Sequence, residues 1–253
     1  MLKMINVTKA FGGVVATNDF SADFEPGSLS AIIGPNGAGK TTLFNLITGK
    51  LKPDSGSIMF NGEEIAGLSP RAIVKRGIGR AFQVASIFPT FTVAQALEGA
   101  VLAHRSKMSD LLRPFSQPSS RQRAEELMEM LGMTSRAGTL SSHLSHGDQK
   151  LLDIGLALAL EPRLLLLDEP TAGMGPEERL QMIERVHFLW QREKITIIFI
   201  EHDMDIVFAR AQMIRVLYYG ALLAEGTPDQ IRTNQKVIDA YLGHGFADDE
   251  VTA

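Results

Sequence analysis

The sequence predicts an α/β protein with a mostly parallel sheet, a small antiparallel β subdomain near the N-terminus and a helical insert. Short apolar runs of strand length alternate with longer segments of helical periodicity, which is typical of a sheet with helices packed on it. Two of these runs, Leu164–Leu167 and Ile195–Ile200, are almost continuously apolar, as in parallel strands that are covered on both faces. The stretch from about 90 to 145 has helical periodicity without a strand pattern and interrupts the alternation.

Length and composition place the chain among ordinary globular proteins. Its 253 residues suggest one large domain or two small ones with a self-sufficient core. Hydrophobic residues make up 45% and charged residues 21% of the chain, which excludes a disordered, collagen-like or coiled-coil protein. The 25 basic and 29 acidic side chains give a net charge of −4, so there is no electrostatic reason to expect nucleic acid as a partner. The absence of cysteine excludes disulfides and thiolate metal sites.

No part of the sequence has the character of a membrane-spanning or secretory segment. The longest apolar runs are far shorter than the roughly 20 residues that a helix needs to cross a bilayer. The N-terminal residues MLKMINVTKAFGG lack the continuous apolar region of a signal peptide. We therefore expect a cytosolic chain.

The elements of the first part of the chain follow from alternating apolar residues and from turn residues. Two strands are expected where apolar and polar residues alternate, a third where a run is fully apolar, and a helix after that run. These elements are the strand through Phe20, Ala22 and Phe24 before the turn at Pro26–Gly27, the strand LSAIIG that ends at Gly34, the helix from Gly39 to about Ile47, and the strand through Ile58 and Phe60 before Asn61–Gly62. The Asn-Gly pair is a strong hairpin signal, because both residues accept a positive φ.

Helices dominate the middle of the chain and alternate with strands after it. Thr92 and Gln95 have the spacing of a capping box at a helix start, and a loop or broken helix is expected from Arg105 to Ser120. The later elements are helices at Arg121–Leu131, Asp148–Leu160 and Pro176–Arg192, strands at Arg163–Asp168 and Ile195–Ile200, a hairpin at Met213–Ala224 that turns near Gly220, and a helix that starts at Thr227–Pro228. We expect a single domain over residues 1–253, with an α/β core at 1–89 and 146–242, the insert at 90–145 and a tail at 243–253.

A glycine-rich run provides the strongest functional signal. The residues Gly34-Pro35-Asn36-Gly37-Ala38-Gly39-Lys40-Thr41-Thr42 match the P-loop pattern in full. The run lies between an apolar strand and a helix, where backbone N–H groups and the helix N-terminus can point at phosphate oxygens. Lys40 would bridge the β- and γ-phosphates, and the hydroxyl of Thr41 would ligate Mg²⁺. The whole run is therefore predicted to bind a nucleoside triphosphate.

A second candidate site follows the apolar strand Leu164–Leu167, where Asp168 and Glu169 stand. An acidic residue at this position is typical of a group that holds Mg²⁺ through its water shell. Glu169 is then placed to orient and deprotonate an attacking water, a role typically worth 10²–10⁴-fold in rate. Acidic residues also end strands without any catalytic role. The P-loop on an earlier strand favours the catalytic interpretation.

The family is indicated by Leu144-Ser145-His146-Gly147-Asp148-Gln149, which precedes a helix and lies twenty residues before Glu169. This run resembles the LSGGQ signature of ATP-binding cassette (ABC) ATPases and implies the ABC nucleotide-binding domain fold. In that family the loop binds the γ-phosphate held by the other subunit, so the resemblance implies that Ser145 and Gly147 bind ATP across a cassette dimer. His146 and Asp148 depart from the pattern, and Asp148 adds a negative charge near the site. Taken alone, Ser145 also fits a simple helix N-cap.

Further residues match ABC motifs in order along the chain. Phe11 stands where the family has the aromatic that stacks on adenine, although a half-buried strand aromatic explains it equally well. Gln83 matches the Q-loop glutamine that reaches Mg²⁺ and the attacking water, and His202 matches the switch histidine that contacts the γ-phosphate. Gly175 departs from the family's D-loop, which has an aspartate there. The resemblance thus implies ATP as the nucleotide, catalytic roles for Glu169, His202 and Gln83, and Mg²⁺ held by Thr41, Gln83 and Asp168.

The segments EPTAGMGP, EHDMDIVF and LSHG are similar to the ATPase subunits of importers for branched-chain amino acids, urea and short amides. This resemblance implies a subunit on the cytoplasmic face of the inner membrane that drives separate permease subunits. A solute-binding protein and a second cassette, identical or homologous, are the further implied partners. Two alternatives remain, the ATPase of a lipid or lipopolysaccharide exporter and a non-transport ABC ATPase. A nucleotide kinase would leave the signature loop and His202 unexplained.

The segment between Gln83 and the insert is where the ABC family grips a coupling helix of the permease. Ile87, Phe88 and Phe91 would form an apolar groove for such a helix. The alternative is that these side chains pack the insert onto the core, and for Phe91 this is the preferred interpretation.

Overall fold

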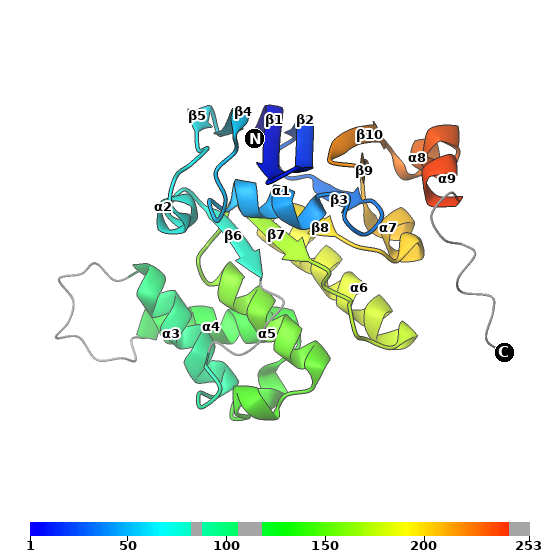
Figure 1. Cartoon of the computed structure of the whole chain (residues 1–253). Coiled ribbons are helices and arrows are strands. Elements are labelled where there is room, and N and C mark those ends of the chain that lie inside the picture. The colour runs from blue at the N-terminus through cyan, green and yellow to red at the C-terminus, as the bar shows by residue number, and fades with distance from the viewer. Residues whose placement is uncertain (82–87, 106–117, 243–253) are drawn as a thin grey trace. The chain divides into compact units, whose positions relative to one another are not determined.

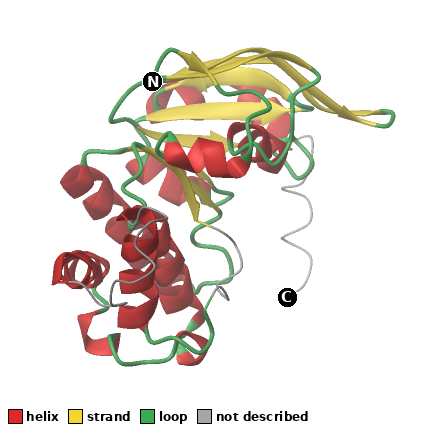
Figure 2. Cartoon of the chain, turned by 90° about the vertical axis from the view of Figure 1, so that its left-hand side faces the viewer, coloured by secondary structure: helices red, strands yellow, loops and turns green. Residues whose placement is uncertain are grey.

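The computed structural model describes residues 1–81, 88–105 and 118–242 (Figure 1). The chain divides into two compact units: unit 1 comprises Met1–Arg76 and Thr196–Ala253, and unit 2 comprises Gly77–Ile195. Unit 1 carries most of the strands and unit 2 most of the long helices. Figure 2 shows the strands in yellow and the helices in red. Within the described ranges, no helix combines the length and the apolar character that a membrane crossing requires.

The N-terminal part of unit 1 is an antiparallel sheet with the strand order β2-β1-β4-β5. Its strands are β1 (Leu2–Phe11), β2 (Val14–Phe24), β4 (Ser55–Phe60) and β5 (Glu63–Glu64). The buried face carries Phe20 and Phe24, which are fully buried, as the period-2 alternation requires. Asn61 and Gly62 join β4 to β5 with φ values of 52° and 85°, which confirms the predicted hairpin.

The second sheet of unit 1 has β3 (Leu29–Ile33) between two parallel neighbours, β8 (Thr196–Ile200) and β9 (Met213–Tyr218). The edge strand β10 (Ala221–Gly226) pairs antiparallel with β9. All residues of β3 and β8 are buried, as expected for parallel strands that are covered on both faces. The helices of unit 1 are α1 (Lys40–Ile47), α2 (Pro70–Lys75), α7 (Met204–Arg210), α8 (Pro228–Arg232) and α9 (Gln235–Leu242).

The described residues of unit 2 form a pair of parallel strands and four α-helices. The strands β6 (Ile78–Ala81) and β7 (Leu164–Asp168) lie side by side, and the helix α5 (His146–Leu158) contacts β6. The helices α3 (Val93–Arg105) and α4 (Pro118–Leu131) pack on each other and on α5, and α6 (Pro176–Glu193) contacts α4 and α5. Two short 3₁₀ helices, η1 (Thr134–Arg136) and η2 (Ser141–His143), precede α5.

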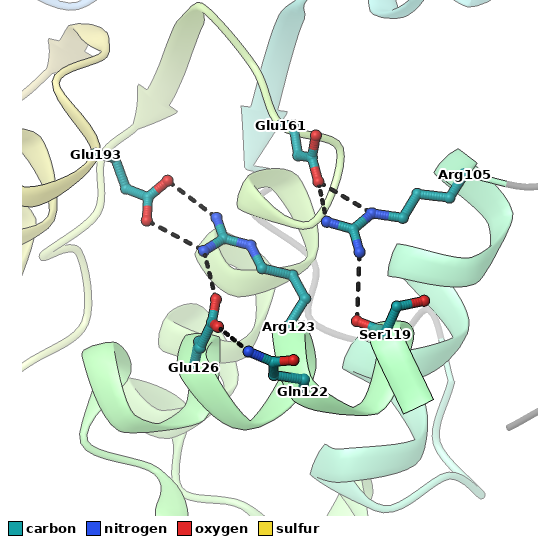
Figure 3. A network of polar contacts seen from close by, with 7 residues as sticks. All are labelled: Arg105, Ser119, Gln122, Arg123, Glu126, Glu161 and Glu193. Carbon is teal, nitrogen blue, oxygen red and sulfur yellow. Dashed lines mark hydrogen bonds and ion pairs between the residues drawn. The ribbon is translucent and has the colours of Figure 1, made fainter. Parts of the chain in front are cut away.

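One arginine–glutamate pair of unit 2 joins two helices, and another joins a helix to the loop before β7 (Figure 3). Arg123 of α4 donates to Glu193 at the end of α6, with Nη2 2.9 Å from Oε2 and Nη1 3.4 Å from Oε1. Arg105 at the end of α3 donates through Nε to Oε1 of Glu161, 3.1 Å away. This hydrogen bond from Arg105 holds the pKa of Glu161 below its usual value.

Most predicted elements are confirmed, with shifts at their ends. Thr92 and Gln95 form the predicted reciprocal cap, with N–O distances of 3.0 and 3.2 Å. The helix predicted from Arg121 begins at Pro118, since proline fits a first helical turn. Of the stretch expected to be a loop or broken helix, residues 106–117 lie outside the described residues. The helices α2, α7 and α9 were not predicted.

Candidate nucleotide site

The P-loop of unit 1 follows β3 and leads into α1 with a backbone that only glycine adopts at two points. Gly39 has φ 101°, and a Cβ there would collide with the carbonyl oxygen of Ala16. Gly34 has φ 154°, and a Cβ there would collide with the carbonyl oxygen of Leu217. The strands that carry Ala16 and Leu217 therefore lie so close to the loop that they leave no room for a side chain at Gly39 and Gly34. Because glycine has no side chain, the backbone N–H groups of this loop can approach a phosphate closely.

Lys40 is the first residue of α1 and is only 6% exposed. Its ammonium group donates to the carbonyl oxygens of Gly34 at 2.7 Å and Pro35 at 3.0 Å. The positive charge is thus held against the loop, next to the helix N-terminus. Thr41 is exposed, so its hydroxyl is accessible to a ligand at the start of α1. The residues present fit a triphosphate, because anions bind where a lysine and a helix N-terminus coincide.

Two further predicted residues of unit 1 lie at strand ends. Phe11 ends β1 and is 47% exposed, with the Nζ of Lys9 5.7 Å from its ring centroid. His202 follows β8 and is exposed, and its backbone N–H donates to the carboxylate of the buried Glu201 at 3.2 Å. Both side chains are therefore accessible to a ligand.

Asp168 ends β7 in unit 2 and is 7% exposed. Its Oδ2 accepts a hydrogen bond from Nη2 of Arg80 at 2.6 Å. Its Oδ1 is buried and has no hydrogen-bond partner among the described residues. A buried carboxylate oxygen normally has a partner, and a water bound to Mg²⁺ would supply one here. The donor set therefore fits the predicted metal role.

Glu169 has a left-handed backbone with φ 49°. Such a conformation is uncommon for a residue with a side chain, and it concentrates at functional sites. The side chain is half-buried. The carbonyl oxygen of Glu169 accepts a hydrogen bond from Nζ of Lys150 at 2.7 Å. The backbone conformation of Glu169 thus fixes the direction in which the chain continues after β7.

Ser145 is the N-cap of α5, as one interpretation of the sequence proposed. Its Oγ accepts from the backbone N–H of Asp148 at 3.2 Å and donates to Oδ2 of Asp148 at 2.8 Å. Arg136 lies 2.9 Å from the same carboxylate oxygen, so the charge that Asp148 brings to the loop is neutralised. Ser145 and Gly147 line a pocket of about 250 Å³ together with Arg136 and Arg185.

The structure thus groups the predicted residues by unit. The P-loop, Phe11 and His202 belong to unit 1, whereas Asp168, Glu169, Ser145 and Gly147 belong to unit 2. Gln83 and Ile87 lie outside the described residues. Phe88 is 37% exposed, and its ring is stacked 5.2 Å from that of the half-buried Phe91.

Sequence reasoning missed Arg80, Lys150 and Arg136. Each acts on a predicted residue or its neighbour, through Asp168, Glu169 and Asp148 respectively. Arg80 lies 88 positions from Asp168 in the sequence, and no local sequence pattern predicts an ion pair over that separation. For Lys150, too, no local pattern indicates that it donates to the loop after β7.

Comparison with protein families places the chain. The family model described as "ABC transporter" matches residues 17–172. The chain belongs to the ABC transporter family. A second family model, "Branched-chain amino acid ATP-binding cassette transporter", matches residues 221–247. The protein is therefore an ATP-binding ABC ATPase.

Known relatives of this ABC ATPase match it over nearly its whole length. It is 36% identical over 252 residues to the high-affinity branched-chain amino acid transport ATP-binding protein LivG of Escherichia coli (strain K12), covering 96% of this chain and 98% of that protein. It is 38% identical over 251 residues to the protein BraF of Pseudomonas aeruginosa, which has the same description, with 96% and 98% covered.

Solved structures of ATP-binding cassettes have the same fold. A nucleotide-free cassette from an ABC transporter matches with a TM-score of 0.83 and 30% identity, covering 95% of this chain and 98% of that one. An ABC transporter cassette in its ADP conformation matches with a TM-score of 0.85 and 30% identity, covering 96% and 98%. The predicted α/β cassette fold is confirmed.

Proposed function

We propose that this ABC ATPase powers the import of branched-chain amino acids or related small polar solutes through a separate membrane permease. The names of LivG and BraF, together with the family model matched at residues 221–247, support this solute class. The subunit would lie at the cytoplasmic face of the membrane and bind the permease subunits, which in turn receive solute from a solute-binding protein. The exposed Phe88, together with Ile87, is the proposed contact for the permease, whereas packing remains the preferred interpretation for the half-buried Phe91.

The proposed hydrolytic site uses Lys40 on the β- and γ-phosphates and Phe11 on the adenine ring. Thr41, Asp168 and Gln83 would hold Mg²⁺, which supplies charge neutralisation on the phosphate oxygens when bound. The observation that carries this assignment is the buried Oδ1 of Asp168, which lacks a partner among the described residues. Glu169 then removes a proton from the attacking water.

Completion of the site requires a second cassette. We propose that Ser145 and Gly147 bind the γ-phosphate held by the facing copy, and that His202 contacts the γ-phosphate within its own copy. For this the hydroxyl of Ser145 must give up its hydrogen bond to Asp148. The ion pair between Arg136 and Asp148 keeps the carboxylate from repelling the incoming phosphate.

The hydrolytic assignment is tested by Glu169→Gln, with phosphate release and ATP affinity measured on the same preparation. A glutamine cannot accept the proton, so turnover should fall 10²–10⁴-fold while ATP affinity stays unchanged. Glu177→Gln, which changes an exposed glutamate in the first turn of α6, is the matched control and should retain turnover. A Glu169→Gln variant with normal turnover would remove Glu169 from this role.

The transport assignment is tested by purifying the chain with the membrane proteins that accompany it. After reconstitution of that complex, leucine uptake should require ATP and a solute-binding protein. Transport of a lipid instead, or purification without any permease, would contradict the proposal.

A further inference from the structure

The loop after β7 is held by the helix α5 through two side chains on one helical face. His146 and Lys150 lie four positions apart, so they project from the same side of α5. The Nε2 of His146 lies 3.3 Å from the carbonyl oxygen of Ala172. The Nζ of Lys150 donates to the same oxygen at 2.9 Å and to the carbonyl oxygen of Glu169 at 2.7 Å. Lys150 thus bridges the two ends of the turn 169–172.

The bridge acts on a backbone that is otherwise unfavourable. Glu169 has φ 49°, and the N–H of Ala172 closes the turn by donating to the carbonyl oxygen of Glu169 at 3.2 Å. The two hydrogen bonds from Lys150 are charge-assisted, and such bonds are among the stronger ones in proteins. Lys150 as a whole is 7% exposed, so water competes little for its hydrogen bonds. The loop conformation that aims Glu169 therefore depends on a buried cation.

Burying the charge of Lys150 costs free energy unless the ammonium group is paired or hydrogen-bonded. Asp153, three positions further along the same face of α5, interacts electrostatically with Lys150, and its Oδ2 has no hydrogen-bond partner within the described residues. Lys150 is thus aimed at backbone carbonyls, although an acidic side chain lies on the same helix face.

We propose that Lys150 is a positioning residue for ATP hydrolysis, which fixes the backbone of Glu169 so that its carboxylate meets the attacking water. This inference rests on the proposed role of Glu169 as the base. It assigns the signature helix a second task, because the helix that presents Ser145 to one nucleotide also sets the base for another. A misplacement of the base by about 1 Å can reduce the rate about a hundredfold.

The test is Lys150→Met in the full chain, with kcat and KM for ATP measured separately and folding checked by thermal unfolding. We expect kcat to fall tenfold to a hundredfold while KM stays within about twofold. Lys150→Arg should recover most of kcat, because its guanidinium can also donate to two carbonyl oxygens. Arg121→Met removes a 71%-exposed cation from α4 of the same unit and is the control that should keep kcat. A Lys150→Met variant with normal kcat overturns the proposal.

A purely structural role is excluded by combining the change with Glu169→Gln. If Lys150 acts through Glu169, Lys150→Met should slow residual hydrolysis in the Glu169→Gln background by less than twofold. The same loss of rate in both backgrounds overturns the proposal. If Lys150→Met does not fold, the comparison is made with Lys150→Gln, which keeps an uncharged N–H donor group on a shorter side chain and should lose an intermediate share of kcat. Normal hydrolysis by Glu169→Gln alone refutes the proposed role of Glu169 as the base, whereas slow hydrolysis by Glu169→Gln with normal kcat in Lys150→Met refutes only this inference.

Discussion

Replacing Asp153 by Asn should stabilise the protein at neutral pH and lose that effect in acid. Asp153 is 5% exposed, and its Oδ2 has no hydrogen-bond partner in the described part of the chain. Burial raises the pKa of this carboxyl from 3.8 to about 6, and the positive charge of Lys150 counteracts part of that rise. The folded protein therefore holds the proton more tightly than the unfolded chain does.

The sign and size follow from this difference in pKa. Below pH 3.8 both states are protonated, so ionisation of Asp153 costs no stability. As the pH rises from 3.8 to about 6, the carboxyl of Asp153 ionises in the unfolded chain but stays protonated in the folded protein, which lowers the free energy of the unfolded state relative to the folded one. The pKa of Asp153 is 3.8 in the unfolded chain and about 6 in the folded protein, and each pKa unit corresponds to 1.36 kcal/mol. The free energy of unfolding therefore falls by about 3 kcal/mol over this window. Asn at this position does not ionise and avoids the loss.

Urea unfolding of the wild type and Asp153→Asn, followed by the fluorescence of Trp190 and by circular dichroism, measures this difference. The comparison at pH 3.5 serves as the control, because both side chains are then neutral. We expect the variant to gain stability relative to the wild type between pH 4 and 6, and to keep the gain at pH 7. A stability difference that is the same at pH 3.5 and pH 7 would refute the reasoning.

Three other substitutions test separate parts of the account. Lys40→Ala should reduce ATP affinity at least tenfold, because a charge-assisted contact to phosphate is lost; calorimetric titration measures it, and unchanged affinity counts against the cradle. Gly39→Ala should destabilise the fold by more than about 2 kcal/mol, because the added Cβ would collide with the carbonyl oxygen of Ala16. The control Gly12→Ala, where φ is 57° and the space is open, should cost only about 1 kcal/mol. Equal losses of stability in urea unfolding would contradict the close approach at Gly39. A double-mutant cycle of Arg123→Met and Glu193→Gln should give a coupling of about 1 kcal/mol, because both side chains are at most 20% exposed, and additive effects would show that the pair does not stabilise the unit.

The parts of the fold that local patterns encode were predictable. Positive φ at Asn61 and Gly62 and the reciprocal cap of Thr92 and Gln95 each depend on a few neighbouring residues. The hairpin of β9 and β10 is also confirmed near its predicted turn. In each case the chemistry that shapes the backbone lies within the segment itself.

Long-range contacts of the site were not predictable in this way. The pair Arg80–Asp168 joins neighbouring strands, and the hydrogen bond from Lys150 to Glu169 joins a helix to the loop after a strand. A sequence shows that a cation and a carboxylate exist, but their pairing depends on how β6, β7 and α5 pack. The short helix α7 was missed for a different reason, since its seven residues are too few to show a period.

The central claim is that two copies share each nucleotide, with Lys40 of one copy and Ser145 of the other on the same triphosphate. Light scattering of Glu169→Gln with and without Mg²⁺ and ATP tests this most directly. The account predicts a mass that doubles only when ATP is present and that stays monomeric when Lys40→Ala is added. A variant that binds ATP and yet keeps the mass of one chain would contradict the account.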